Sequence, residues 1–132
     1  MDIFTHAAVG FTIGAKLGHP VAGTVAGIVP DIALGIKRKC RPPRLYVVFH
    51  SYEVAIAMLA GGLYAGGLVL VVALAWCSHF LLDVYTHSGD WAPRWLFVKR
   101  PRQNRFEEWE FFNQSWRNGL LLAIALCGAT LI

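Results

Sequence analysis

The chain has 132 residues, of which 56% are hydrophobic and only 15% are charged. Because soluble domains carry about a quarter of charged residues, this composition favours a membrane-embedded protein, and the length favours one domain over residues 1–132. The net charge is +4, but the basic residues lie in short loops between apolar segments, where the positive-inside rule explains them better than nucleic-acid binding does. Three scattered cysteines without a CxxC pair argue against a disulfide framework and a cysteine zinc knuckle.

Two short helices rich in alanine and glycine are predicted at residues 3–17 and 21–29. A Gly-His-Pro sequence separates them, because glycine commonly ends a helix and proline begins one. Pro30-Asp31 is expected to stop the second helix. At 1.5 Å per residue the helices are about 22 Å and 14 Å long, too short to cross a hydrocarbon core of about 30 Å. The pattern therefore predicts a tightly packed helical hairpin.

A helical hairpin would have two consequences. It would return the chain to its starting side, which would bring Asp31 beside His6. It would also use four small residues, whose spacing allows close contact of the two backbones as in small-xxx-small interfaces. These residues are Gly10, Gly14, Gly23 and Gly27.

The middle of the chain predicts two longer helices. Residues 37–44 are rich in arginine and lysine and are typical of a loop. A helix is predicted from about 45 to 63, with its polar residues in the first half, and glycine pairs at 61–62 and 66–67 indicate its end and a turn. Residues 68–87 are the clearest membrane span, because they are polar only from Ser78 onward.

Two ionisable residues interrupt the apolar sequence of this span. His79 and Asp83 are four residues apart, so a helix would place them one above the other on the same face. Such a pair is costly in an apolar setting unless it binds something or pairs internally. The pair is therefore the centre of a predicted site.

The C-terminal part is predicted to lie at a membrane interface. Residues 91–118 are amphipathic and mix tryptophan with arginine and glutamate, which is typical of anchoring at the headgroup level. Residues 119–132 predict a last apolar helix. The predicted fold class is all-α, an integral membrane bundle of short helices with an N-terminal hairpin and about three further helices. Helices this short are accommodated by local thinning of the bilayer or by assembly, so a homo-oligomer is also expected.

Topology predicts that candidate ligands from four helices meet at one depth. The basic loops 37–44 and 94–105 flank the two central helices on the same side, which should be cytoplasmic. The start of one central helix, the end of the next and the open end of the hairpin then share that side. The residues brought together would be His6, Asp31, His50, His79 and Asp83.

Three imidazoles and two carboxylates suit a divalent metal such as zinc, with manganese or iron as alternatives. An open coordination position would hold a water and lower its pKa, which would supply hydroxide as a nucleophile. Other interpretations stay open. Asp83 could instead pair with Arg94, and Glu53 could be a general base or could form a salt bridge with a loop arginine. His87 and Asp90 could extend the site or cap the turn at Gly89.

Several short motifs together resemble a known family. They are Thr5-His6 followed by Gly10, then Pro30-Asp31, then His50-Ser51 at the start of an apolar segment, then H-x-x-L-D-x-x-T-H from His79 to His87. This order is similar to that of a bacterial family of predicted membrane-bound metal-dependent hydrolases, distantly similar in ligand pattern to zinc-dependent phospholipase C. The resemblance covers residues 2 to about 118.

The resemblance implies a helical membrane protein in which His6, Asp31, His50, His79 and Asp83 correspond to the family's presumed metal ligands. The chain also departs from the pattern. Many members carry a second acidic residue where this chain has Ala33, and a second histidine five residues from the position of His50, where this chain has Leu45 and Ala55.

The leading hypothesis is a metal-dependent hydrolase in the bacterial inner membrane, multi-pass, with its basic loops in the cytoplasm. It would act on an ester or phosphoester of a small molecule or membrane lipid. The metal would be held by the five residues named above, with His87 as a further candidate ligand. Glu53 or Asp90 would be the catalytic base, and Arg94 or Arg117 would stabilise phosphate charge.

Two other hypotheses belong to different classes. In the first, the chain is a non-catalytic membrane module that acts through protein–protein assembly, and its metal or polar cluster is structural. In the second, the loop charges make it a basic peripheral binder of nucleic acid or of a partner protein, which would require salt-sensitive binding.

Overall fold

The computed structural model describes residues 3–32, 44–86 and 93–97, and within these ranges the chain is helical apart from turns and one isolated bridge. The predicted all-α class is confirmed for this part of the chain. The predicted final helix at 119–132 and most of the interfacial stretch 91–118 lie outside it. The helices are α1 (Ile3–Lys16), α2 (Pro20–Ile32), α3 (Arg44–Phe49), α4 (Tyr52–Ala65) and α5 (Gly67–Thr86).

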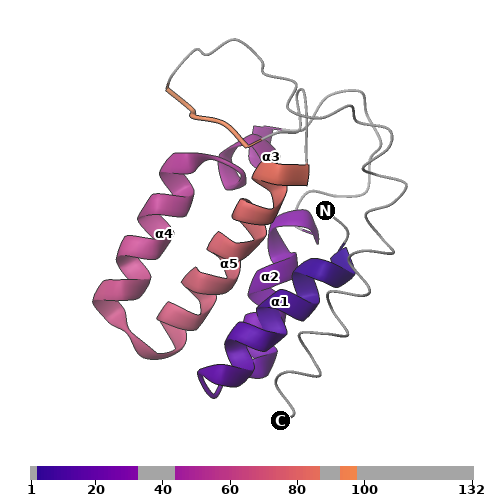
Figure 1. Cartoon of the computed structure of the whole chain (residues 1–132). Coiled ribbons are helices and arrows are strands. Elements are labelled where there is room, and N and C mark those ends of the chain that lie inside the picture. The colour runs from indigo at the N-terminus through magenta and orange to yellow at the C-terminus, as the bar shows by residue number, and fades with distance from the viewer. Residues whose placement is uncertain (1–2, 33–43, 87–92, 98–132) are drawn as a thin grey trace.

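Helices α1 and α2 form the predicted antiparallel hairpin (Figure 1). The turn between them uses Gly18 at φ 82°, a left-handed conformation that glycine adopts without a steric penalty. The amide of His19 donates to the carbonyl of Gly14 at 2.7 Å and closes the C-terminus of α1. Helix α2 then begins at Pro20, as predicted.

The predicted end of the second helix near Pro30-Asp31 is confirmed to within one residue, because α2 extends to Ile32. Pro30 lies in the last turn of α2. There its missing N–H removes one hydrogen bond, and only two helical residues follow it. Pro30 is also fully buried. As a result Asp31 lies on the last turn of α2 rather than in a loop.

Close contact of the two backbones holds the hairpin together. A Cβ atom added to Gly10 would collide with the carbonyl of Gly23, and one added to Gly27 would lie 2.5 Å from the carbonyl of His6. Glycine is therefore required at these crossings, as the small-residue spacing predicted. The contact between Gly27 and His6 places the end of α2 beside the start of α1.

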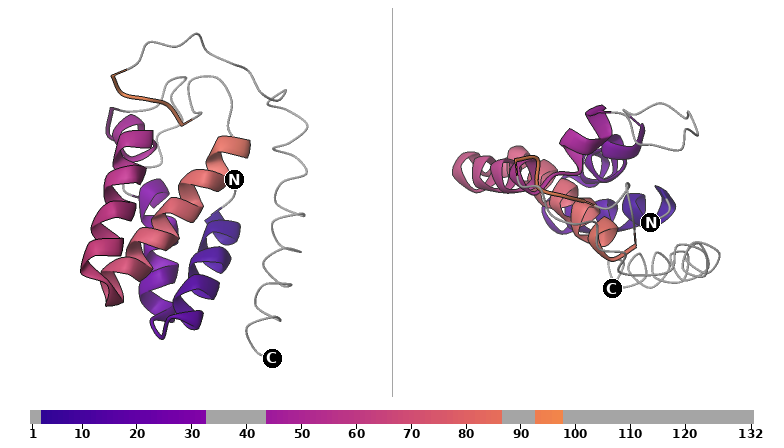
Figure 2. Two further views of the ribbon diagram at one scale, coloured as in Figure 1. Left: turned by 60° about the vertical axis from the view of Figure 1, so that its left-hand side comes forward. Right: turned by 90° about the horizontal axis from the view of Figure 1, so that it is seen from above.

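Helix α5 is the central element of the described structure. It contacts α1 and α2 on one side and α4 on the other, and both views in Figure 2 keep it between α4 and the N-terminal hairpin. Its buried residues are mostly small or apolar, such as Val71, Ala73 and Ala75. The position of α5 against three helices allows its side chains to meet groups from several parts of the chain.

The predicted continuous helix at 45–63 is broken into α3 and α4 at His50-Ser51. Ser51 has extended backbone angles, φ −106° and ψ 149°, and its hydroxyl accepts a hydrogen bond from the amide of Val54 as an N-cap. Serine is a preferred N-cap residue because its oxygen replaces a missing helical acceptor. The break turns α4 away from α3 and leaves His50 in the junction between them.

Helices α4 and α5 form a second antiparallel pair joined at Gly66 and Gly67, both with positive φ. The predicted turn at this glycine pair is confirmed, whereas Gly61 and Gly62 lie inside α4 and do not end it. Among the described helices, α5 alone is long and apolar enough to cross a membrane, over Gly67–Val84.

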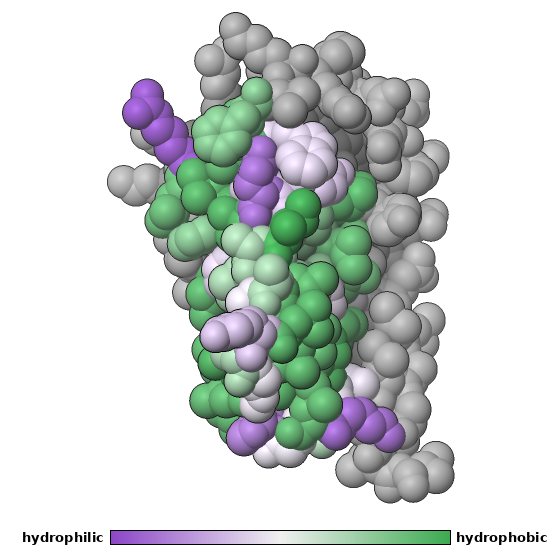
Figure 3. Space-filling model, turned by 90° about the vertical axis from the view of Figure 1, so that its left-hand side faces the viewer, coloured by the Kyte–Doolittle hydropathy of each residue, from purple (hydrophilic) through white to green (hydrophobic). Residues whose placement is uncertain are grey.

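The outer surface of this second pair is apolar. Figure 3 shows a face that is largely hydrophobic over its middle, with hydrophilic residues toward its two ends. Large hydrophobic side chains are exposed on both helices of the pair. They include Ile56, Leu63 and Tyr64 of α4 and Leu68, Val69 and Leu81 of α5.

Candidate metal centre

Helix α5 contributes two adjacent polar side chains to the interior. His79 and Asp83, predicted to share one face, lie within 3.1 Å of each other between His79 Nε2 and Asp83 Oδ2. Their exposed fractions are 1% and 0%. A carboxylate buried to this degree is costly unless charged or hydrogen-bonding groups surround it, so the neighbours of Asp83 decide what the site can do.

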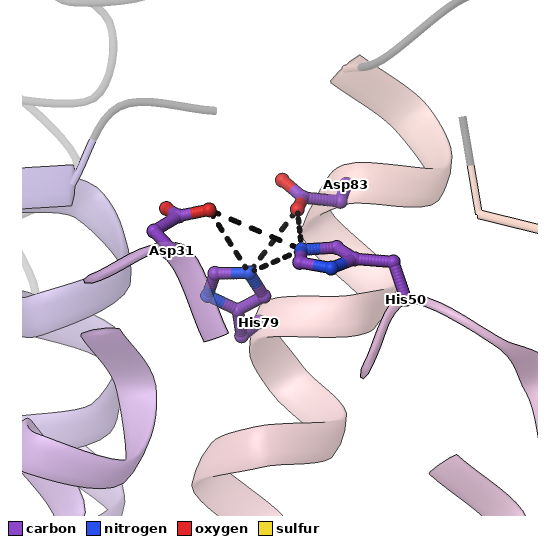
Figure 4. Close-up of side chains that lie close together, drawn as sticks. All are labelled: Asp31, His50, His79 and Asp83. Carbon is purple, nitrogen blue, oxygen red and sulfur yellow. Dashed lines mark hydrogen bonds and ion pairs between the residues drawn. The ribbon is translucent and has the colours of Figure 1, made fainter. Parts of the chain in front are cut away.

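Two more candidate ligands meet this pair from other elements. Asp31 approaches from the last turn of α2 and His50 from the junction between α3 and α4 (Figure 4). One potential ligand atom from each of Asp31, His50, His79 and Asp83 lies within 4.8 Å of the other three. The structure thus brings together four of the five residues that the sequence predicted as metal ligands.

We call this group of four the His₂Asp₂ cluster. The separations between its ligand atoms suit a cation with tetrahedral coordination. The two Nε2 atoms of His50 and His79 are 3.0 Å apart, and Asp83 Oδ2 lies 3.0 Å from the first and 3.1 Å from the second. Asp31 Oδ1 is farther, at 3.9 Å and 3.7 Å from the same nitrogens. Ligand bonds of about 2.0–2.1 Å would give tetrahedral edges of ~3.3 Å, within the range of these separations.

Backbone carbonyls orient both imidazoles. His79 Nδ1 donates to the carbonyl oxygen of Gly27 at 2.7 Å, and His50 Nδ1 donates to that of Tyr46 at 3.1 Å. A carbonyl only accepts, so each Nδ1 carries the proton and the Nε2 lone pair of each neutral ring is directed at the cluster. Metal-binding histidines are commonly oriented in this way by the groups around them.

This arrangement brings two imidazole Nε2 atoms and a carboxylate oxygen of Asp83 close together. With both rings neutral, the Nε2 lone pairs of His50 and His79 face each other and face a carboxylate oxygen of Asp83 at hydrogen-bond distance. Such groups repel unless a cation, either a metal ion or additional protons, lies among them. Two imidazoles and two carboxylates form a ligand set that zinc, manganese and iron accept. The His₂Asp₂ cluster can therefore hold a divalent metal ion.

His6, the fifth predicted ligand, lies behind Asp83 rather than in the His₂Asp₂ cluster. Its Nε2 is 3.1 Å from Asp83 Oδ1, the oxygen that faces away from the other two histidines, and its ring stacks on that of His79 with centroids 3.8 Å apart. Burial lowers the pKa of His6, and the hydrogen bond with Asp83 opposes that shift. His6 thus contacts a candidate ligand, as do the neighbouring groups that commonly tune metal affinity.

Sequence reasoning missed the groups that orient the rings. Tyr46 lies one helical turn before His50, offers its carbonyl and stacks its ring on the imidazole with centroids 3.8 Å apart. The i, i+4 spacing of an aromatic residue and a histidine was a signal for that contact. Gly27 gave no comparable signal, because a backbone carbonyl is present at every residue.

The other predicted site residues have different positions. Glu53 lies outside the His₂Asp₂ cluster, and both of its carboxylate oxygens accept hydrogen bonds from the backbone amide of Leu96. Arg94 is exposed, whereas Asp83 is fully buried and lies against His6, His50 and His79. The alternative ion pair between Asp83 and Arg94 is therefore not what the structure shows. The remaining candidates, His87, Asp90 and Arg117, lie outside the described residues.

Comparison with known proteins adds no assignment: the chain matches no protein-family model, no curated protein and no solved structure.

Proposed function

We propose that this protein is a membrane-embedded, metal-dependent hydrolase that cleaves an ester or phosphoester at the cytoplasmic membrane interface of a bacterium. The observation that carries the proposal is the His₂Asp₂ cluster, in which two oriented imidazoles direct their lone pairs at two carboxylates. Two imidazole nitrogens and two carboxylates that lie this close together favour a cation between them. The resemblance of the sequence motifs to membrane-bound hydrolases supports the same class.

The apolar surface supports the membrane part of the proposal. Helix α5 has the length and composition of a membrane span, and exposed hydrophobic side chains cover the face in Figure 3 between two more polar ends. His79 and Asp83 lie in the C-terminal half of α5, so the site would lie toward one end of the span rather than at its middle. A lipid or a small molecule at the interface could then reach it.

Each residue of the His₂Asp₂ cluster would have a defined role in the proposed reaction. A bound divalent ion would supply Lewis acidity and an activated water. His50, His79 and Asp83, each with a side chain at most 1% exposed, would hold that ion, and Asp31, with 26% of its side chain exposed, would border the open side. Zinc is the first choice for this ligand set, with manganese and iron as alternatives. The backbone amide of Arg94 donates to the carbonyl of His50, and the exposed guanidinium of Arg94 would attract phosphate charge.

The first experiment is elemental analysis of the full chain purified in detergent, beside His79→Ala and Asp83→Asn. We expect about one equivalent of metal in the unchanged protein and metal affinity reduced by more than ~100-fold in each variant, since removal of a ligand should exceed the ~10- to 100-fold cost of an outer-shell change. His19→Ala is the matched control, because His19 is an exposed histidine at the turn between α1 and α2.

Hydrolysis is then tested on a nitrophenyl phosphodiester, a nitrophenyl carboxylic ester and phospholipid in vesicles, each with and without added metal. We expect metal-dependent turnover of at least one of these substrates by the unchanged protein and by His19→Ala. Turnover that persists at full rate in His79→Ala would refute the proposal.

A second candidate function is a non-catalytic membrane module in which the metal fastens the helices together and the protein acts through assembly. One observation favours it: the cluster joins α2, the α3–α4 junction and α5, and reaches α1 through His6. This function predicts that chelation unfolds the protein while none of the test substrates is cleaved. The mass of the detergent-extracted protein would show whether it is a homo-oligomer.

A further inference from the structure

The segment 93–97 lies against the α3–α4 junction, immediately beside a cluster residue. The amide of Arg94 donates to the carbonyl of His50 at 3.2 Å, and the amide of Tyr52 donates to the carbonyl of Arg94 at 3.3 Å. These two bonds form an isolated parallel bridge between Ser51 and Arg94. A distant part of the chain thus binds the backbone on both sides of Ser51.

These bonds replace hydrogen bonds that the helix break has removed. In a continuous helix the amide of Val54 would donate to the carbonyl of His50, but here it donates to the Ser51 hydroxyl at 3.3 Å. The carbonyl of His50 then takes its donor from Arg94. Without the segment, the peptide group that follows His50 would lose its donor, and the backbone of this cluster residue would be held less firmly.

Glu53 fixes the segment in place. Its carboxylate accepts the amide of Leu96 through both oxygens, at 2.9 Å and 3.1 Å, and the amide of Phe97 at 3.4 Å. Partial burial raises the pKa of Glu53, but the hydrogen bonds from Leu96 and Phe97 outweigh that effect and hold the pKa below its usual value. An ionised carboxylate forms stronger hydrogen bonds to amides than a neutral acceptor does.

Aromatic contacts extend this attachment to α5. The ring of Tyr52 stacks on Trp95 with centroids 4.8 Å apart and meets Phe80 edge-on at 5.0 Å. Phe80 is buried and directly follows His79 in α5. The segment is therefore linked both to the backbone of one cluster histidine and, through Tyr52, to the neighbour of the other.

We infer that Glu53 is a positioning residue: it clamps the segment 93–97 onto the α3–α4 junction and so fixes the imidazole of His50 in the His₂Asp₂ cluster. This inference rests on the proposed metal site and gives Glu53 a role other than that of the general base expected from the sequence. Both carboxylate oxygens of Glu53 are engaged by amides, and a lowered pKa makes a carboxylate a weaker base.

The test uses the full chain with Glu53→Ala, Glu53→Gln and the control Ile56→Ala, an exposed α4 residue. Cobalt(II) titration followed by visible absorption reports affinity and ligand geometry. We expect Glu53→Ala to weaken cobalt binding by ~10- to 100-fold, as outer-shell changes do, and to alter the absorption bands. Glu53→Gln keeps an acceptor oxygen, so it should fold even if Glu53→Ala does not, and should show a smaller loss than Glu53→Ala. Ile56→Ala should bind cobalt as the unchanged protein does.

A second readout separates this inference from the proposed function. The nitrogen resonances of the His50 ring in metal-free protein report which nitrogen carries the proton. We expect one protonated Nδ1 in the unchanged protein and a mixture of tautomers in Glu53→Ala and, to a smaller extent, in Glu53→Gln. If the unchanged protein binds no cobalt, the metal site fails, and these resonances still decide the role of Glu53. Unaltered cobalt binding and unaltered His50 resonances in both Glu53 variants would overturn the inference. So would unaltered cobalt binding with turnover lost and the acid limb of the pH profile displaced, which would make Glu53 a base.

Discussion

The two helical pairs, α1–α2 and α4–α5, differ in how the two helices of each pair pack together. In α1–α2 the backbones touch, so a Cβ on Gly10 or Gly23 would meet the facing main chain. In α4–α5 the tight glycine is Gly62, where an added Cβ would meet the Cβ of Ala73 first and backbone atoms of Leu70 and Val69 at 3.3 Å and 3.4 Å. A backbone obstacle cannot be relieved by changing a residue, whereas a side-chain obstacle can. The α1–α2 pair, which we call the platform for α5, is therefore held by main-chain contact, whereas the tightest obstacle between α4 and α5 is a methyl group that a substitution can remove.

This difference bears on the site because α5 takes its orientation from the platform. The carbonyl of Gly27 in α2 accepts the Nδ1 proton of His79, and His6 in α1 contacts Asp83. Helix α4 contributes no residue to the His₂Asp₂ cluster. Changes at the α1–α2 backbone contact should therefore affect both stability and metal binding, whereas a change at the contact between Gly62 and Ala73, away from the cluster, should affect stability alone.

The largest effect is expected for Gly10→Ala. The added methyl would force the backbones of α1 and α2 apart, which should lower the free energy of unfolding by about 2–3 kcal/mol, the upper part of the range for overpacked cores. The shift would also move the Gly27 carbonyl from His79 and weaken metal binding. Unfolding in detergent followed by circular dichroism, together with zinc titration, measures both. Loss of stability with metal affinity fully retained would break the link between platform and site.

His6→Phe should have the next largest effect. Phenylalanine keeps a ring to stack on His79 but removes the hydrogen bond to Asp83 Oδ1. Loss of this outer-shell partner should reduce zinc affinity by ~10- to 100-fold, measured by competition with a chromogenic chelator. If His6→Phe removed bound metal altogether, His6 would be a direct ligand rather than a support for Asp83.

Gly62→Ala tests the second helical pair. Its new methyl would meet the Cβ of Ala73, so we expect a loss of about 1–2 kcal/mol in the free energy of unfolding with zinc affinity unchanged. The double variant with Ala73→Gly removes the obstacle and should recover most of that loss. Failure of the second change to restore stability would show that α4–α5 is as rigid as α1–α2.

The smallest effect is expected for Gly61→Ala. A Cβ at Gly61 has no neighbour within 4 Å, and Gly61 lies inside α4, where alanine is favoured over glycine by about 0.5–1 kcal/mol. Equilibrium unfolding should show a gain of this size. A loss instead would mean that this part of α4 contacts something, such as a second copy of the chain.

Local features of the fold followed from the sequence. The Gly-His-Pro separator and the glycine pair at 66–67 marked two real turns. Glycine frees the backbone and proline restricts it wherever they occur, so these signals are local. The break at His50-Ser51 did not follow. Ser51 is the N-cap of α4, and the distant segment 93–97 binds the backbone on both sides of this break, a contact that local sequence does not show.

The candidate site was predictable in its residue types and less so in its arrangement. The spacing of His79 and Asp83 fixed their common face on α5, and the hairpin argument correctly brought Asp31 to the same end as His50. The separation of His6 from the His₂Asp₂ cluster and the engagement of Glu53 by Leu96 and Phe97 were not visible. Both depend on contacts between residues more than 40 positions apart.

The sequence alone determined the helical class, two of the turns, the close-packed glycine hairpin and the histidine–aspartate pair on α5, because spacing and residue type act over a few neighbouring positions. Only the tertiary structure decided which four side chains meet and which nitrogen of each histidine faces the cluster. Those choices are made by backbone carbonyls, such as that of Gly27, 52 residues from His79. Every residue offers such a carbonyl, so nothing in the sequence distinguishes the one that is used.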